Sequence, residues 1–168
     1  MLNNNKILLL IIGICFGTIP EDYFQQKVNY EIHVTLDDST HTLTGTESIV
    51  YYNNSPDTLK FIWFHLWPNA YKNIKTEFSK QMWKFNNTDF SFSKEKDRGY
   101  IDSLNFIVED LPATWEYHPN WIDVIKLHLP TPLKPGNAIN IYTPFFVKIP
   151  KVFSRLGHTG KHYEITQW

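Results

Sequence analysis

The stretch VNYEIHVTLDDSTHTLTGTESIVYY, Val28 to Tyr52, decides the fold. Its first part alternates apolar and polar residues with a period of two, which is the period of side chains along a β-strand. Such a pattern predicts a strand with one apolar face and one polar face, half-buried in the domain. The apolar face consists of Tyr30, Ile32, Val34 and Leu36.

The second part of the stretch predicts a partner for this strand. DDST, 37–40, has the composition of a turn, and HTLTGTESIVYY is rich in β-branched and aromatic residues. Gly45 lies inside this second strand, where a glycine indicates a bulge or a close approach of another backbone. The turn formers NNSPD, 53–57, come next, and TLKFIWFHLW then predicts a third strand that ends at Pro68. Three strands joined by short turns predict an antiparallel meander.

The stretch FIWFHLWPNAY, Phe61 to Tyr71, concentrates aromatic residues. Both faces of its strand are apolar, which favours burial on both sides, in a core or at a domain interface, over an exposed platform for a ligand. We therefore interpret Trp63, Phe64 and Trp67 as scaffold. Large rings suit that role because each buries about 150–250 Å².

The rest of the chain completes the predicted domain. IKTEFSKQMWKF has apolar residues near helical spacing and predicts one short helix, and the polar segment 86–99 predicts a mobile loop. Strands are predicted in YIDSLNFIVED, WIDVIKLHL, NAINIYTPFFVKI and HYEITQW, with a loop at LPATWEYHPN and a turn at PTPLKPG. Thr143-Pro144 predicts an edge or a bulge. The predicted fold class is mainly β, an antiparallel sandwich or saddle-like domain with one short helix.

The first 17 residues are typical of a secretory signal peptide. The apolar run from Ile7 to Phe16 is too short for a bilayer span, which needs about 20 residues. The small-x-small pattern that ends at Gly17 predicts cleavage there and a mature domain over 18–168. Cys15 is alternatively a lipid-attachment site, although Ile14 is bulky where lipoprotein signals prefer a small residue. We expect an exported protein, in the periplasm, the cell envelope or outside the cell, with no membrane span after signal removal.

Charge and cysteine content argue against nucleic-acid binding and against stabilisation by disulfides. The formal net charge is −1 and no basic block occurs, so the electrostatic pattern of a nucleic-acid-binding protein is missing. Cys15 is the only cysteine, so the mature domain has no disulfide despite an oxidising destination. Its stability must come from a packed core, which a chain of 168 residues is long enough to form.

Motifs for catalysis are missing from the sequence. A zinc hydrolase of the H-E-x-x-H type places two histidines on one helical face, and none of the seven histidines fits that motif. His158 and His162 are four residues apart, but the glycines between and before them disfavour a helix. We interpret GHTGKHYE as a turn with two exposed histidines. We expect neither catalytic residues nor metal ligands in this chain.

Three segments resemble one known family. GTESIVYYNNSPD, NNSPDTLKFIWFHLWPNAY and RLGHTGKHYEITQW are similar to the amino-terminal β domain of bacterial zinc aminopeptidase-like proteins of peptidase family M1. The resemblance runs from about Tyr23 to Trp168, and IWFHLWPNAY is its most specific block. It implies a saddle-shaped β domain that precedes a thermolysin-like catalytic domain, and this chain ends before such a domain begins. The chain is then a fragment.

The resemblance also implies cofactor, partners and one site residue. Zinc would belong to the catalytic domain of the parent protein and not to this fragment. The partners would be that carboxy-terminal catalytic domain and a peptide substrate. Family members place a glutamine late in the β domain, where it reaches the amino-terminal residue of the substrate, and Gln167 matches that position by following YEIT. An ordinary polar strand residue is the alternative for Gln167.

Two other functions remain open at this stage. A free-standing secreted β-sandwich that binds carbohydrate or protein would also be rich in aromatic residues and poor in catalytic ones. Exposed tryptophans would favour that hypothesis, and fully buried ones would count against it. A structural cell-envelope domain without a ligand is the third hypothesis.

Overall fold

The computed structural model describes residues 23–166. The predicted signal peptide with Cys15, and Gln167, lie outside the described residues. The helices are the α-helix α1 (Glu77–Lys84) and the 3₁₀ turns η1 (Trp67–Tyr71) and η2 (Glu95–Asp97). The strands are β1 (Lys27–Asp37), β2 (Thr42–Tyr52), β3 (Leu59–His65), β4 (Tyr100–Asp102), β5 (Ile107–Val108), β6 (Leu111–Pro112), β7 (Trp115–Tyr117), β8 (Val124–Leu133), β9 (Ala138–Lys148), β10 (Leu156–Thr159) and β11 (His162–Ile165).

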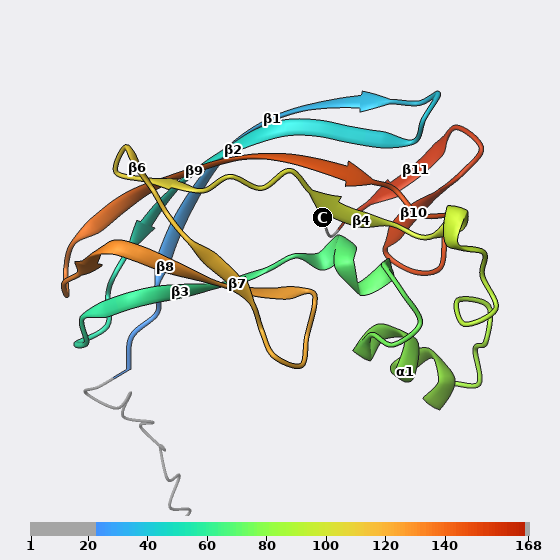
Figure 1. Cartoon of the computed structure of the whole chain (residues 1–168), viewed down its shortest axis with the longest axis horizontal. Coiled ribbons are helices and arrows are strands. Elements are labelled where there is room, and N and C mark those ends of the chain that lie inside the picture. The colour runs from blue at the N-terminus through green and yellow to red at the C-terminus, as the bar shows by residue number, and fades with distance from the viewer. Residues whose placement is uncertain (1–22, 167–168) are drawn as a thin grey trace, which may run out of the picture.

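The strands form two layers and one separate hairpin (Figure 1). The larger sheet has the order β1-β2-β9-β5-β6, with β4 also paired to β9, and the smaller sheet has the order β3-β8-β7. All of these pairings are antiparallel. The hairpin β10-β11 lies at the same end of the molecule as α1 (Figure 1). The predicted fold class, a mainly β antiparallel domain with one short helix, is confirmed.

The predicted three-stranded meander is wrong in its third strand. β1 and β2 pair over their whole length, as expected. β3 leaves that sheet and pairs with β8 in the other layer. The turn between β2 and β3 explains the change of layer: the buried side chain of Asn53 donates to the backbone oxygens of Asp57 and Leu133 and accepts from Ser55. β2 takes β9 as its second neighbour instead.

β9 runs without a break through Thr143-Pro144 in the middle of the larger sheet. The prediction of an edge or a bulge there is wrong, and the pairing explains why the proline is tolerated. On one side of β9, β5 pairs as far as Tyr142 and β4 pairs only from Phe146. Pro144 therefore falls in a gap between two short strands, where a missing N–H removes no ladder hydrogen bond. The Thr143 hydroxyl closes the gap by accepting a hydrogen bond from the Asn105 N–H at 3.0 Å.

Several elements differ from the sequence prediction in length. β8 continues through PTPL, which was predicted as a turn, and the register between β3 and β8 shifts between Leu59 and Phe61, opposite these prolines. LPATWEYHPN contains the short strands β6 and β7 and is not only loop. The segment 86–99 contains η2 and is fixed to the core by Phe90, which is fully buried. The short helix is confirmed; the Thr76 hydroxyl caps it by accepting from the Ser79 N–H.

The core fills the space between the layers in two clusters among the described residues. The larger cluster joins both sheets and includes Ile49, Ile62, Ile125, Leu127 and Ile141. The second lies toward α1 and the β10-β11 hairpin and includes Leu43, Tyr71, Phe90, Val147 and Leu156. None of the described helices is long and apolar enough to cross a membrane.

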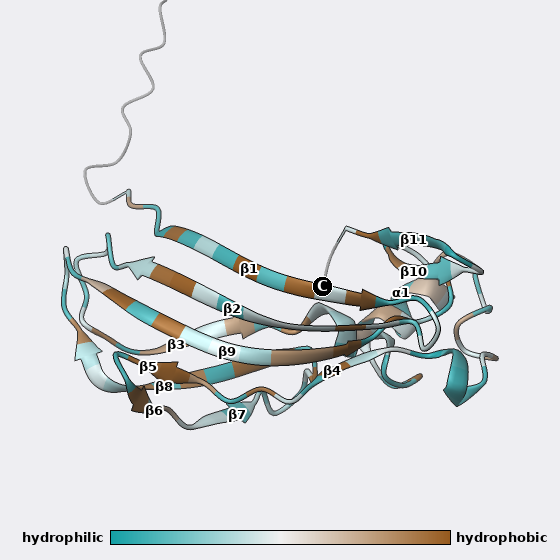
Figure 2. Ribbon diagram, turned by 90° about the horizontal axis from the view of Figure 1, so that it is seen from above, coloured by the Kyte–Doolittle hydropathy of each residue, from teal (hydrophilic) through white to brown (hydrophobic). Residues whose placement is uncertain are grey.

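β1 is the edge strand of the larger sheet (Figure 2), and its apolar side chains are largely exposed within the described residues. The apolar side chains predicted to be half-buried are 41–61% exposed: Tyr30, Ile32, Val34 and Leu36. The expected burial of this strand is therefore wrong, because a hollow separates its inner face from the smaller sheet. The predicted close approach at Gly45 is confirmed: a Cβ at that position would overlap the carbonyl oxygen of His33.

Candidate functional site

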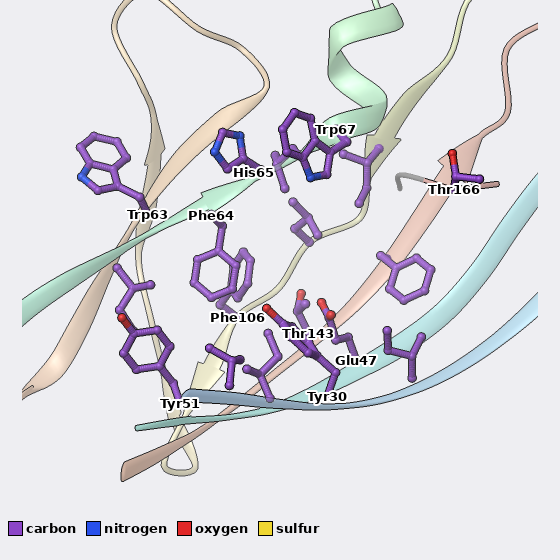
Figure 3. Close-up of a pocket in the computed structure, with 18 residues that line it drawn as sticks. Tyr30, Glu47, Tyr51, Trp63, Phe64, His65, Trp67, Phe106, Thr143 and Thr166 are labelled. Carbon is purple, nitrogen blue, oxygen red and sulfur yellow. The ribbon is translucent and has the colours of Figure 1, made fainter. Parts of the chain in front are cut away.

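The outer face of β3 carries a row of aromatic side chains that continues into the loop after β7. We call it the aromatic surface and define it as Phe61, Trp63, His65, Trp67, His118 and Trp121. Its tryptophans are 40–46% exposed. The other face of β3, with Ile62 and Phe64, points into the molecule, and Figure 3 shows Trp63 and His65 on the opposite side of the strand from Phe64.

Ring contacts hold the aromatic surface together. The His65 and Trp67 rings stack with their centroids 4.4 Å apart, and the His118 and Trp121 rings stack at 4.1 Å. The Trp63 ring joins the two parts by meeting His118 at 5.4 Å and an interplanar angle of 57°. Lys126 reaches across from β8 and places its ammonium group 4.3 Å from the Phe61 ring centroid, an attractive cation–π contact.

This exposure corrects the sequence interpretation of the segment. Both faces of the strand are apolar, as predicted, but within the described residues only the face with Ile62 and Phe64 is covered. A groove of about 450 Å³ runs along the aromatic surface between Trp63 and Trp121, with Glu77 and Asp123 at its wall. Exposed tryptophans along a groove are typical of an interaction surface, because a soluble protein rarely leaves a large apolar patch open without a function.

A second hollow lies between the two sheets, and we call it the intersheet cavity. It has a volume of about 530 Å³. The inner faces of β1, β2 and β9 form its floor, and Phe64 and Phe106 form its opposite wall (Figure 3). Tyr30, Glu47 and Thr143 point into it from three neighbouring strands of the larger sheet (Figure 3).

Glu47 is the carboxyl group of this cavity. Burial raises its pKa above the ordinary value for glutamate, because a low-dielectric surrounding disfavours the charged form. Burial also raises the pKa of the Tyr30 phenol, and the charge of Glu47 raises it further. The Glu47 carboxylate therefore lies near enough to the Tyr30 phenol to disfavour its ionisation.

Sequence reasoning missed Glu47, although the sequence contains a signal for it. The residues of β2 that share its face are Leu43, Gly45, Ile49 and Tyr51, all of them apolar or small. A carboxylate at an alternate position of an otherwise apolar strand face must either find a partner or lie in a cavity. The pattern therefore marks Glu47, but it does not locate the cavity, which depends on how far the second sheet extends.

The two histidines of GHTGKHYE do not form a metal site. They lie on the hairpin β10-β11, so the predicted turn is confirmed, and His162 is exposed as expected. His158 is instead half-buried, with its ring stacked on that of His41 at 3.6 Å. Burial, and then the neighbouring His41, lower the pKa of His158. No three potential metal ligands come together anywhere in residues 23–166.

The predicted substrate residue, Gln167, lies outside the described residues, so its role stays a prediction. The residue before it, Thr166, lines the intersheet cavity. Its N–H and its hydroxyl both donate to the carbonyl oxygen of Arg155, at 3.2 and 2.7 Å.

Three comparisons with known proteins gave the following results. No protein-family model matches the chain, and no curated protein matches it. Among solved structures, the chain is similar to a two-domain M1 zinc metallopeptidase, crystallised as a variant bound to L-arginine, at 11% identity and a TM-score of 0.45. The match covers 77% of this chain and 22% of that protein. The chain therefore spans less than a quarter of that protein's length.

Proposed function

We propose that this chain is the non-catalytic amino-terminal β domain of an exported zinc metallopeptidase of the M1 type, and that its aromatic surface packs against the catalytic domain. The observation that supports this proposal is the exposure of the aromatic surface on β3 and η1. These two elements are formed by IWFHLWPNAY, the block on which the family resemblance mainly rests.

The composition of the surface suits a domain interface. Interface centres are enriched in tryptophan and other aromatic residues, and the tryptophans there contribute strongly to binding. Trp63, Trp67 and Trp121 lie along one face, held in place by stacked histidines. Preformed rings of this kind lose little conformational freedom when a partner covers them.

In this proposal the zinc ion and the peptide bond that is cleaved belong to the catalytic domain. The described residues do not fit a zinc site, since no three histidine, cysteine or acidic side chains lie together in 23–166. The contribution of this chain would be to support the active site and to present Gln167 to the amino-terminal residue of the substrate.

The first test is the size and metal content of the native gene product, captured from its source cells with an antibody against this chain. We expect a protein much larger than the 19.9 kDa of this chain, with about one zinc ion per molecule. It should hydrolyse aminoacyl amides and lose that activity on treatment with a chelator. A native product of about this chain's own mass, without zinc, would contradict the proposal.

The second test concerns the surface itself. In the native product, the double substitution of Trp63 and Trp67 by alanine should loosen the domain contact, so that limited proteolysis separates the domains faster. Trp83→Ala is the matched control, because Trp83 is 53% exposed on α1, outside the aromatic surface. Equal cleavage rates for the double variant and the control would count against docking through this surface.

A free-standing binding module is the second candidate, and the exposed tryptophans favour it by the criterion set above. The ring geometry argues against a flat carbohydrate platform, in which several aromatic faces lie coplanar. The Phe61 and Trp63 rings instead stand at 78° to each other, and Trp63 stands at 57° to His118. Quenching of tryptophan fluorescence by glycans, lost in Trp121→Ala, would support this candidate over the first.

A further inference from the structure

The carboxylate of Glu47 lies in the intersheet cavity, and within residues 23–166 no cationic side chain is paired with it. It sits on the inner face of β2, between Ile32 of β1 and Thr143 of β9. Within residues 23–166 it forms no hydrogen bond and no ion pair. Some other carboxylates of the described residues do have cationic partners: Asp97 lies 3.1 Å from Lys151 Nζ, and Asp38 lies 2.7 Å from Lys161 Nζ.

An unpaired charge in such a place costs stability, because partial burial removes water and no hydrogen bond from residues 23–166 replaces it. A partly buried charged side chain without a partner is unfavourable in a protein. Where such a side chain lines a cavity and has a shifted pKa, it is typical of a binding site. The neighbouring groups do not offset the cost. The hydroxyl of Thr143 is already engaged with the backbone of Asn105 and Pro144, and Tyr30 is a neutral phenol.

The other walls of the cavity indicate the chemical character of the rest of the ligand. Its walls are mainly apolar, and the Phe64 and Phe106 rings face the floor with their centroids 5.5 Å apart. A volume of about 530 Å³ falls in the range of small-molecule pockets. A ligand that fits both parts has one positive charge and an apolar body.

A metal ion does not suit this arrangement. Calcium takes six to eight oxygen ligands and magnesium needs octahedral coordination, whereas the described residues that line the cavity include a single carboxylate, Glu47. An ammonium group, by contrast, needs one anionic partner and hydrogen-bond acceptors, and its charge restores the ionised form that the cavity disfavours.

We propose that the intersheet cavity binds a small organic amine, with the ammonium group against Glu47 and the apolar part against the rings of Phe64 and Phe106. The Tyr30 hydroxyl, which forms no hydrogen bond within the described residues, is placed to accept a second hydrogen bond from the ammonium group. Trp63, His65 and Trp67 of the aromatic surface also line this cavity, but the proposed ammonium site at Glu47 lies on β2 of the larger sheet and does not depend on the proposed docking.

The test uses the full 168-residue chain and two probes of nearly equal shape, 2-phenylethylamine and 2-phenylethanol, in NMR titrations near neutral pH. We expect the amine to bind about tenfold more tightly than the alcohol or better, since a charge-assisted hydrogen bond supplies at least that factor. Chemical-shift changes should centre on β2 near Glu47 and on Phe106.

Substitutions then assign the binding to the carboxylate. Glu47→Gln keeps the shape of the side chain and removes its charge, so the amine should bind it no better than the alcohol. Glu31→Gln is the matched control: it removes the same charge from the adjacent strand, at a side chain that is 75% exposed, and should bind the amine like the unmodified chain. Ile32→Trp, at the open edge of the cavity, should weaken both probes alike.

Three outcomes would overturn the proposal. One is equal affinity of the unmodified chain for both probes, and another is undiminished amine binding in Glu47→Gln. The third is no amine binding at millimolar concentration by a chain that circular dichroism shows to be folded. Should Glu47→Gln fail to fold, the unmodified chain and Ile32→Trp still decide the question. None of these results bears on whether the native product is a metallopeptidase.

Discussion

β1 and β9 flank the same strand, β2, along its whole length, and both carry alternating apolar residues. Their environments differ sharply. The inward side chains of β9 are almost fully buried, with Ile141 1% exposed, whereas Ile32 of β1 is 41% exposed. The larger sheet is therefore wider than the smaller sheet that covers it. A strand's pattern tells which face is apolar, and only the extent of the opposite layer decides whether that face is covered.

The largest expected effect tests this contrast directly. Ile141→Ala should lower the free energy of unfolding by about 3 kcal/mol, because it leaves a void in the centre of the core. Ile32→Ala removes the same atoms from a partly exposed side chain of β1 and should lower the free energy of unfolding by less than about 1 kcal/mol. Urea unfolding followed by far-UV circular dichroism measures both. Similar losses would mean that β1 is covered in solution.

The next prediction concerns Gly45 of β2, where both β1 and β9 approach closely. A Cβ at Gly45 would overlap the carbonyl oxygen of His33 on β1 and lie 2.7 Å from Phe145 Cζ on β9. Gly45→Ala should therefore cost about 1–3 kcal/mol. β1 has a free outer edge, so we expect it to shift while β9 stays. Amide exchange should become faster in β1 and remain unchanged in β9; faster exchange in β9 would contradict this.

Glu47 lies on β2, between the buried inner face of β9 and the exposed inner face of β1. Its substitution should have a smaller effect on stability, and that effect should depend on pH. Its folded-state pKa is raised by burial, so the neutral form is favoured in the fold. Its contribution to stability is complete below the unfolded value and is lost as the pH rises through the folded pKa. Glu47→Gln should therefore melt above the unmodified chain at pH 7 and level with it at pH 4. An equal melting temperature at pH 7 would show that the carboxylate is well solvated.

The smallest effect concerns the turn that joins the open strand to β2. Asp37 accepts hydrogen bonds from the Ser39 hydroxyl at 2.6 Å, from the Ser39 N–H at 2.8 Å and from Thr40. The Ser39 hydroxyl and N–H, followed by Thr40, lower its pKa to about 2. The stabilisation is present above the unfolded pKa of about 3.9 and is lost as the pH falls through about 2.

An NMR titration of the Asp37 carboxyl group checks this value, and a midpoint near 4 would rule out the turn as drawn. Asp37→Asn should change the melting temperature only slightly, because the site is exposed. Asp57→Asn, in another exposed turn, is its control.

Local patterns predicted the elements of this fold well. The alternation in β1 and β2, the apolar spacing of α1 and the glycine at position 45 each act over a few residues, and each prediction of element type or close approach holds. What failed depends on contacts between distant segments. β3 changes sheets, Pro144 is tolerated because β4 and β5 leave a gap, and Phe90 fixes a polar segment to the core.

The candidate sites also combine features that depend on local sequence with features that depend on contacts between distant segments. The sequence marks the aromatic residues and, in hindsight, the carboxylate on the apolar face of β2. It does not show that the Trp63 face is exposed or that a cavity lies beside Glu47, because both depend on the relative widths of two sheets built from separate parts of the chain. The predicted role of Gln167 stays a prediction.

The position of β9 in the larger sheet has a consequence for biosynthesis. β2 ends at Tyr52, whereas β9, the strand that pairs with it in the middle of the larger sheet, begins only at Ala138. At a synthesis rate of about 5–20 residues per second, on the order of ten seconds separates the two strands. During that time the β1-β2 hairpin has emerged with its apolar face unpaired, which makes it a substrate for chaperones. The sheet closes by a contact of long sequence separation, which slows folding, and it forms only after most of the chain has been translated.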